Sequence, residues 1–242
     1  MDQRETSGIS AFRNDIASHR GYVYSTGSRL SSRMANSRLT EAVIALADFR
    51  ARRVLDIGCG DGTFTVELLQ RSGASRVVGV DPAKEAVELA REKGAGLPLE
   101  FSVGNAYHLP FQPDSFDIAC LRGVLHHMDR PCDAVREAFR VAPALVVVEP
   151  NGYNPGVKIL ERLSPYHIRH RERSFSARTL NKWVRETGGL VTAFEWCGLL
   201  PMFCPDWLAR AAKSLEPAVE RMPLARNLLC AVYAFRADRK DS

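Results

Sequence analysis

The chain has 242 residues, of which 45% are hydrophobic and 25% charged, and its formal net charge is +5. This is the ordinary balance of a soluble globular protein, long enough for one domain with appendages. The mild positive charge permits anionic partners and demands none.

Leader, membrane and disulfide features are not expected. The first twenty residues carry charges throughout, which argues against a secretory signal. The longest uncharged apolar stretch, 196–205, is too short to cross a bilayer. The six cysteines form no C-x-x-C pair, so we expect reduced, buried thiols in a cytoplasmic protein and no metal site.

Strand-like and helix-like segments alternate from residue 53. Short apolar runs predict strands at 53–57, 76–80, 99–103, 116–121 and 144–149. Amphipathic runs predict helices at 63–71, at 83–93 and from about 131. The alternation predicts right-handed βαβ units. The expected fold is α/β, a parallel, doubly wound, Rossmann-like sheet of about seven strands with helices on both faces.

The alternation changes beyond residue 150. The pattern predicts a short helix at 158–163, a basic segment, a helix from Ser176 to about 187, a strand at 190–196, an amphipathic segment at 205–222 broken by Pro217, and a final strand at 227–236. We expect an N-terminal extension over 1–40 and a domain over 41–242. Insertions are expected at 151–185 and 197–225, the second forming a helical lid.

Three glycines follow the first predicted strand, at positions 58, 60 and 62. Glycines let a backbone pass close to a ligand without a Cβ clash. A dinucleotide-binding turn would place its third glycine one residue later, where this chain has Thr63. The spacing therefore disfavours an NAD-dependent oxidoreductase.

Two carboxylates accompany this turn. Asp56 precedes the first glycine by two residues, where it could meet an ammonium group, and Asp81 ends the second strand. A carboxylate at the tip of the second strand can accept both hydroxyls of a ribose. The pattern favours a nucleoside ligand that also carries a positive charge.

Four stretches then occur in order: VLDIGCGDG at 54–62, VVGVDPAKEAVELAREK at 77–93, GNAYHLPFQPDSFDIACLRGVLHHMDRP at 104–131 and VVVEPN at 146–151. Together they resemble the class I S-adenosylmethionine-dependent methyltransferases of the small-molecule type. The resemblance implies that the donor S-adenosyl-L-methionine is bound by Asp56, Gly58, Cys59, Gly60, Asp81, Pro82, Asn105, Ala106 and Arg122. The turn would hold the methionine part, Asp81 the ribose, and Asn105, where the family more often has Asp, the adenine.

The acceptor side is less defined by sequence. His126 and His127 follow the fourth strand, and either could act as general base, or the pair could only shape the site. Candidate acceptor contacts are Glu149, Asn151, Tyr153, Arg169 and Arg171. The two arginines lie in a basic run, 158–185, that is either a solvated face or an anion-binding segment, with its core 167–173 expected to be a loop.

The expected function is methyl transfer to a small-molecule acceptor, at oxygen rather than nitrogen or carbon, with an acceptor that is anionic or amphipathic. An RNA methyltransferase is the alternative, prompted by a pI near 9.0. Against it, the sequence has no RNA-binding module, so a nucleic-acid partner is not favoured. A donor-binding protein without catalysis also remains open, and the sequence does not indicate an oligomeric state.

Overall fold

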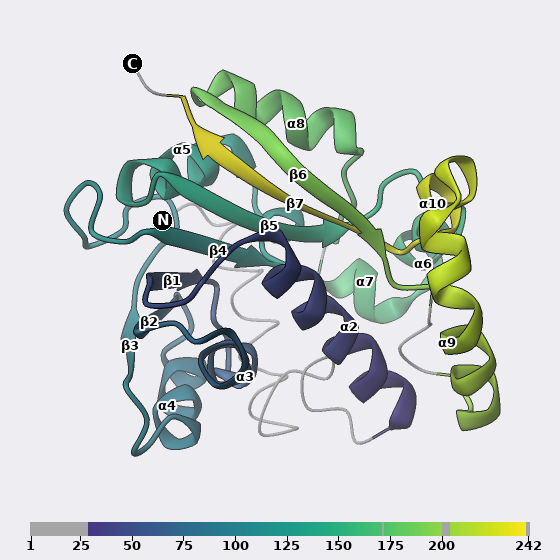
Figure 1. The fold of residues 1–242 in the computed structure, drawn as a ribbon, viewed down its shortest axis with the longest axis horizontal. Coiled ribbons are helices and arrows are strands. Elements are labelled where there is room, and N and C mark those ends of the chain that lie inside the picture. Colours follow the sequence, from purple (N-terminus) through teal and green to yellow (C-terminus); the bar gives the residue numbers. More distant parts are fainter. Residues whose placement is uncertain (1–28, 171, 200–203, 241–242) are drawn as a thin grey trace.

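The computed structural model describes residues 29–170, 172–199 and 204–240. A seven-stranded sheet forms its centre, in the order β3-β2-β1-β4-β5-β7-β6 (Figure 1). The strands are β1 (Arg53–Ile57), β2 (Arg76–Asp81), β3 (Leu99–Val103), β4 (Ile118–Arg122), β5 (Ala144–Pro150), β6 (Gly189–Cys197) and β7 (Val232–Arg239). The pairs among β1 to β5 are parallel, whereas β7 runs antiparallel to both β5 and β6.

Helices cover both faces of this sheet. They are α2 (Leu30–Leu46), α3 (Thr63–Ser72), α4 (Lys84–Lys93), the 3₁₀ turn η1 (Leu125–His127), α5 (Pro131–Val141), α6 (Pro155–Leu163), α7 (Pro165–Arg169), α8 (Ala177–Glu186), α9 (Asp206–Arg221) and α10 (Pro223–Leu229). On one face α2 and α3 bury Val43 and Leu68 against the sheet, and on the other α5 and α8 bury Phe139 and Leu180. The doubly wound α/β fold predicted from the sequence is confirmed, with one antiparallel strand added.

Local signals explain several helix starts. Pro131 and Pro155 stand at the first turn of α5 and α6, where a missing N–H costs nothing. Asn154 caps α6 by accepting the N–H of Val157, and Ser176 caps α8 by accepting that of Thr179, both at 3.1 Å.

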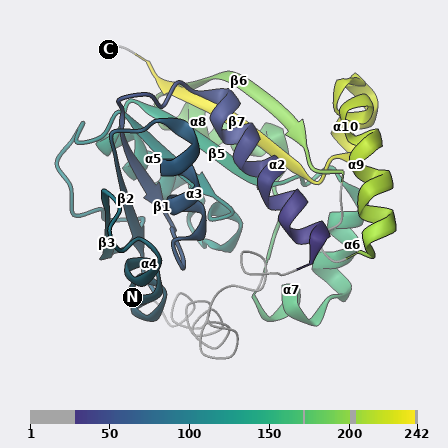
Figure 2. The same cartoon turned by 60° about the horizontal axis from the view of Figure 1, so that its bottom comes forward.

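Four helices, α6, α7, α9 and α10, gather beyond the carboxyl ends of β4 and β5, beside α2 (Figures 1 and 2). This is the edge where open α/β sheets bind ligands. None of the described helices is both long and apolar enough to span a membrane.

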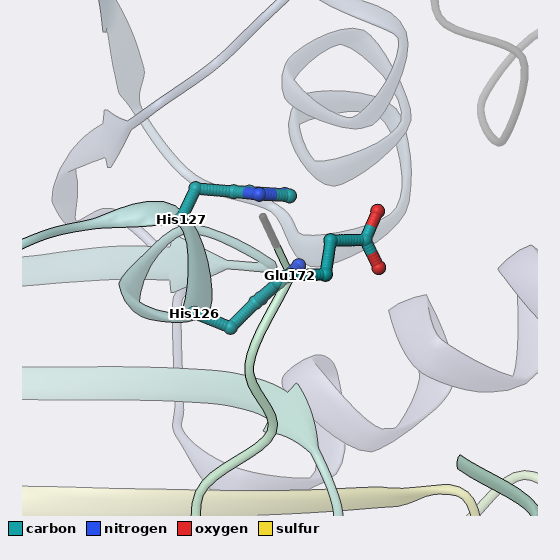
Figure 3. Close-up of side chains that lie close together, drawn as sticks. All are labelled: His126, His127 and Glu172. Carbon is teal, nitrogen blue, oxygen red and sulfur yellow. The ribbon is translucent and has the colours of Figure 1, made fainter. Parts of the chain in front are cut away.

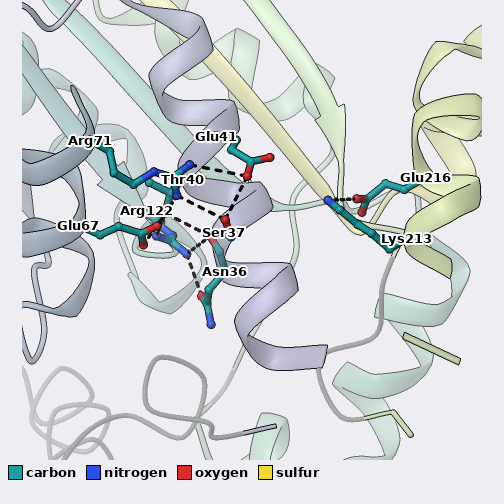
Figure 4. Close-up of polar contacts among 9 residues, drawn as sticks. All are labelled: Asn36, Ser37, Thr40, Glu41, Glu67, Arg71, Arg122, Lys213 and Glu216. Carbon is teal, nitrogen blue, oxygen red and sulfur yellow. Dashed lines mark hydrogen bonds and ion pairs between the residues drawn. The ribbon is translucent and has the colours of Figure 1, made fainter. Parts of the chain in front are cut away.

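Helix α2 is fastened to the sheet by Arg122 at the end of β4 (Figure 4). The guanidinium donates to the Asn36 side chain at 2.8 Å and to the Thr40 hydroxyl at 3.1 Å. It also lies over the ring of Phe64, 4.6 Å from the ring centre. Because α2 runs unbroken through residue 40, the boundary expected between extension and domain falls inside one helix.

Two expectations about the C-terminal part were wrong. The segment predicted as a strand from residue 227 is helical up to Leu229, because Pro223 opens α10, and β7 begins only at Val232. Pro217 does not break the amphipathic segment but lies inside α9. A proline removes one backbone hydrogen bond, and the turns of α9 that precede it are anchored by the buried Ala209 and Glu216.

Candidate active site

The glycine-rich turn after β1 has the shape that its residues predict. Gly58, Gly60 and Gly62 all have positive φ, at 76°, 54° and 75°. A Cβ at Gly58 would come within 2.5 Å of the Val124 side chain, so this turn packs directly against the loop after β4. The Gly58 N–H donates to the carbonyl of Val80 at 2.7 Å, which fixes the turn against β2. The turn after β1 is therefore held between the end of β2 and the loop after β4.

Asp81 lies at the end of β2, where the sequence analysis placed it. Its carboxylate accepts the backbone N–H groups of Gly60 and Ala83, both at 2.9 Å. The side chain is 7% exposed. Burial raises the pKa of Asp81 to about 6, although the two N–H donors act against that shift.

Asp56 is buried beneath the turn. Its carboxylate accepts the Thr65 hydroxyl at 2.6 Å, and burial raises its pKa to about 6. A third carboxylate, Asp61, is also buried and pairs with Lys93 at 2.8 Å. Sequence reasoning did not single out Thr65, Asp61 or Lys93, although Asp61 stands within the glycine motif itself. A cluster of buried carboxylates around a glycine turn suits a cationic ligand.

The loop after β3 stands beside Asp81. The Gly104 N–H donates to the Asp81 carbonyl at 3.1 Å. Asn105 accepts the Tyr107 N–H with its side-chain oxygen at 2.9 Å, which leaves its NH₂ group for other contacts. Ala106 is nearly buried and Pro82 is exposed. The two segments expected to flank ribose and adenine are thus adjacent.

The side chains of Cys59 and Arg122 point away from the place expected for the donor. The Cys59 thiol is buried, which raises its pKa well above the usual value, and its side chain packs with Val87 and Phe101. Only its backbone is left to contact a ligand. Arg122 points to α2, as described above, so we propose that it fastens this helix in place of the adenine contact expected from the sequence. A buried strand has two covered faces, and the sequence alone does not indicate which one a given side chain occupies.

Glu149, at the end of β5, lies beneath the histidine pair. It is 1% exposed, and its oxygens accept the backbone N–H groups of Val124 and Leu125 at 2.9 and 2.8 Å. Its carboxylate also contacts His126 Nδ1 at 2.8 Å. Each Glu149 oxygen thus has two partners, the fourth being the backbone N–H of His126 at 3.2 Å, so we assign Glu149 a positioning role in place of the acceptor contact expected from the sequence.

The pKa values of the two histidines are shifted in opposite directions. Burial acts to lower the pKa of His126, but the Glu149 carboxylate outweighs it and the pKa is raised. The pKa of His127 is lowered well below the usual value, first by burial and then by the neighbouring His126. The two rings lie 3.8 Å apart between centroids, and Glu172 stands beside them (Figure 3). The pair predicted from sequence is therefore joined by two glutamates from distant segments.

The remaining acceptor-side candidates separate into two groups. Asn151 is fully buried and its amide donates to the carbonyls of Asn227 and Cys230, so we assign it a structural role in place of the acceptor contact expected from the sequence. Tyr153 is 36% exposed, and Arg169 is exposed at the end of α7. Arg171 lies outside the described residues. The segment expected as a loop, 167–173, begins inside α7, and His170 after this helix is buried and stacks on Tyr166 at 4.0 Å.

Known proteins resemble this chain most clearly around the glycine turn. Residues 55–144 match the family described as Methyltransferase domain. An uncharacterized methyltransferase of Bacillus subtilis, YcgJ, is 42% identical over 104 residues, which cover 41% of this chain and 40% of that protein. A demethylmenaquinone methyltransferase of Lactococcus lactis is 33% identical over 100 residues, or 40% of each chain. The aligned part thus spans about two fifths of these relatives' length.

Solved structures extend the likeness of fold to nearly the whole chain. A SAM-dependent methyltransferase of Thermotoga maritima superposes with a TM-score of 0.70 at 20% identity, covering 96% of this chain and 100% of that one. Magnesium protoporphyrin IX methyltransferase of Synechocystis, solved with bound S-adenosylhomocysteine, gives 0.63 at 15% identity, covering 98% and 96%. The first of these proteins depends on S-adenosylmethionine, and the second was solved with the product of that donor. Residues 55–144 thus match a methyltransferase domain, and the chain has the fold of class I S-adenosylmethionine-dependent methyltransferases.

Proposed function

We propose that this protein transfers a methyl group from S-adenosylmethionine to an oxygen atom of a small-molecule acceptor. The observation that carries the proposal is the meeting of the donor turn with the histidine pair. Gly58 packs against Val124, and η1, with His126 and His127, follows directly. A donor on the turn would present its sulfonium methyl toward that side.

Each part of the donor has a matching group in the described residues. The Asp81 carboxylate faces the turn from the end of β2, suited to the ribose hydroxyls. The buried Asp56 supplies negative charge for the ammonium and sulfonium groups. Gly58 and Gly60 have no Cβ, so the backbone between them leaves space for the methionine part of the donor. The amide of Asn105 stands beside Asp81 for the adenine.

Methyl transfer to oxygen is an in-line displacement. The new C–O bond forms as the S–CH₃ bond breaks, and the electron pair of that bond stays on sulfur, giving S-adenosylhomocysteine. Positioning supplies most of the acceleration, and a hydroxyl acceptor must in addition lose its proton. We place this activation at the part of the site that His126 and His127 form, where Glu149 holds His126 in one orientation.

The helices beyond the sheet favour an amphipathic acceptor. Leu163 on α6, Trp207 on α9 and Leu224 on α10 are 74%, 71% and 83% exposed. Arg169, also exposed, stands at the end of α7 in the same group of helices. Exposed apolar side chains together with an arginine suit a molecule with an apolar body and an anionic group. We assign the acceptor-covering role to α9, as the sequence pattern suggested.

The test measures donor binding and acceptor methylation separately, and it distinguishes a small-molecule acceptor from RNA. Calorimetry should show binding of S-adenosylhomocysteine and no binding of NAD. Incubation with S-adenosylmethionine and a panel of phenols, hydroxy acids and quinols should add one methyl by mass to an oxygen-bearing acceptor. Methylation of tRNA, with none of the small molecules changed, would reject the proposal in favour of an RNA substrate. Binding of donor without turnover of any acceptor would leave only donor binding.

A further inference from the structure

Three side chains from two segments distant in sequence converge at the edge of the donor site. His126 and His127 come from the turn after β4, and Glu172 follows α7 (Figure 3). One ring nitrogen of each histidine and a carboxylate oxygen of Glu172 all lie within 4.8 Å of one another. Within the described residues, no other group of three such side chains meets this condition.

Both histidines are oriented by hydrogen bonds from outside the cluster. His126 Nδ1 contacts the buried Glu149 carboxylate at 2.8 Å, which leaves Nε2 as its ligand atom. The imidazole of His127 hydrogen-bonds to the backbone of His170. A metal-binding histidine characteristically uses one nitrogen for the ion and the other for a carboxylate or a backbone carbonyl. This cluster has both kinds of support.

The surrounding charge favours a cation. The carboxylates of Glu149, Glu172 and Glu161 all act on His126. Glu161 is offset by Lys158 at 3.1 Å and Glu172 in part by His167 at 3.4 Å, whereas the basic side chain that contacts Glu149 is His126 of the cluster itself, at 2.8 Å. A divalent ion at the cluster would therefore lie near three carboxylates, with His167 and His170 as basic neighbours.

We propose that His126, His127 and Glu172 bind a divalent transition-metal cation of the zinc type beside the donor site. Two imidazoles and one carboxylate suit zinc, iron or cobalt, whereas magnesium prefers oxygen ligands. Bond lengths of about 2.0–2.2 Å bring ligand atoms to roughly 3.4 Å from one another in a tetrahedral site. Ligand atoms up to 4.8 Å apart must therefore approach one another by up to about 1.4 Å, and the partly buried side chain of Glu172 can move toward the histidines.

The role of the cation rests on the proposed function, whereas its binding does not. Three protein ligands leave a coordination position open, as in catalytic zinc sites. An acceptor hydroxyl in that position loses its proton to solvent more readily, because the cation lowers its pKa. The oxygen then attacks the methyl carbon, and sulfur keeps the electron pair of the broken bond. In this arrangement the metal, rather than an imidazole, activates the acceptor.

Direct metal binding tests the site without reference to turnover. Metal-stripped protein without a polyhistidine tag is dialysed against zinc, and bound metal is counted by mass spectrometry. A Cys132→Ser background removes the thiol that is only partly buried. We expect one zinc per chain, retained in His108→Asn, a control in which an exposed histidine outside the cluster is changed. His127→Asn and Glu172→Gln should each weaken binding by at least about tenfold.

Cobalt gives a second readout. Its visible absorption should indicate nitrogen and oxygen ligands, without a thiolate-to-cobalt band, and should disappear in Glu172→Gln. No stoichiometric zinc, or equal binding by the wild type and both cluster variants, would overturn the proposal. If His127→Asn fails to fold by circular dichroism, Glu172→Gln decides alone. S-adenosylhomocysteine is titrated into the same samples: donor binding without zinc rejects only the metal site, and zinc without donor binding rejects only the proposed function.

Discussion

The Asp81 carboxylate accepts the backbone N–H of Gly60 at 2.9 Å, and so joins the end of β2 to the glycine turn that follows β1. One oxygen serves this contact and the other accepts from Ala83. The same carboxylate therefore shapes the donor turn and, in the proposed function, accepts the ribose hydroxyls.

Asp81→Asn should weaken binding of S-adenosylhomocysteine by roughly tenfold or more. An amide keeps one acceptor oxygen, loses the charge and turns its NH₂ toward one of the two N–H donors, and a hydrogen bond to a charged group contributes about 1.5–3 kcal/mol. Calorimetry measures the change. Glu88→Gln is the matched control, since it removes an exposed carboxylate from the adjacent helix α4. Unchanged affinity in a folded Asp81→Asn protein would remove this residue from the site.

Asp56 gives a prediction about pH. Burial raises its pKa from 3.8 to about 6, so the folded state holds this proton more tightly than the unfolded state. A raised carboxyl pKa gives stability that is present below the unfolded value and is lost as pH rises through about 6. The ligand-free protein thus bears a cost at neutral pH from this buried carboxylate.

Asp56→Asn should therefore stabilise the ligand-free protein at neutral pH, by up to about 3 kcal/mol, because each pKa unit corresponds to about 1.4 kcal/mol. The asparagine oxygen can still accept the Thr65 hydroxyl. Urea unfolding at several pH values checks this, and the gap between variant and wild type should close toward about pH 4. If the difference in unfolding free energy did not change with pH, or if the variant were less stable at neutral pH, the buried charge of Asp56 would not be what destabilises the protein.

Arg122 should prove to be a residue that fastens α2 rather than one that contacts the donor. Arg122→Met removes its donors to Asn36 and Thr40 and leaves their oxygens without this partner. Loss of a buried charged hydrogen-bonding group costs about 2–4 kcal/mol. We expect that loss in the free energy of unfolding, with faster amide exchange in α2. A large fall in donor affinity at unchanged stability would restore the adenine contact expected from the sequence.

The sequence correctly predicted elements that are defined by hydrophobic periodicity or by glycine. The strands at 53–57 and 99–103 have the predicted bounds, and Asp81 ends β2 beside the turn. In each of these elements a single local requirement dominates. A buried parallel strand must be apolar, and a turn with positive φ favours glycine. Local sequence is enough in such places.

Other features depended on tertiary contacts that local sequence does not contain. Glu149 lies at the end of a strand, where a carboxylate can face a ligand or the protein interior. It faces the interior because the backbone N–H groups at the start of η1 donate to it. His170 lies in a densely charged run, yet it is buried because Tyr166 stacks on it. Glu172 joins the histidine pair from a segment more than forty residues away. Long-range pairing of polar groups is what the sequence failed to predict.

The basic run offers a final prediction, at Arg169. This side chain is exposed at the end of α7, among the helices that stand beyond the carboxyl ends of β4 and β5 (Figure 2). In the proposed function it attracts the anionic group of the acceptor. Arg169→Gln should raise the KM of the acceptor found in the mass screen by about two- to fivefold, the size expected of an exposed ion pair of about 0.5–1 kcal/mol.

The donor KM should stay unchanged in Arg169→Gln, because Asp81 and the glycine turn belong to the opposite side of the proposed reaction site. Added salt should raise the acceptor KM of the wild type more than that of the variant, since screening weakens an exposed ion pair. Arg185→Gln is the control: it removes an exposed arginine from the last turn of α8, a helix that packs on the sheet with α5. Equal kinetics in all three proteins, or an uncharged acceptor, would mean that this arginine only keeps the surface soluble.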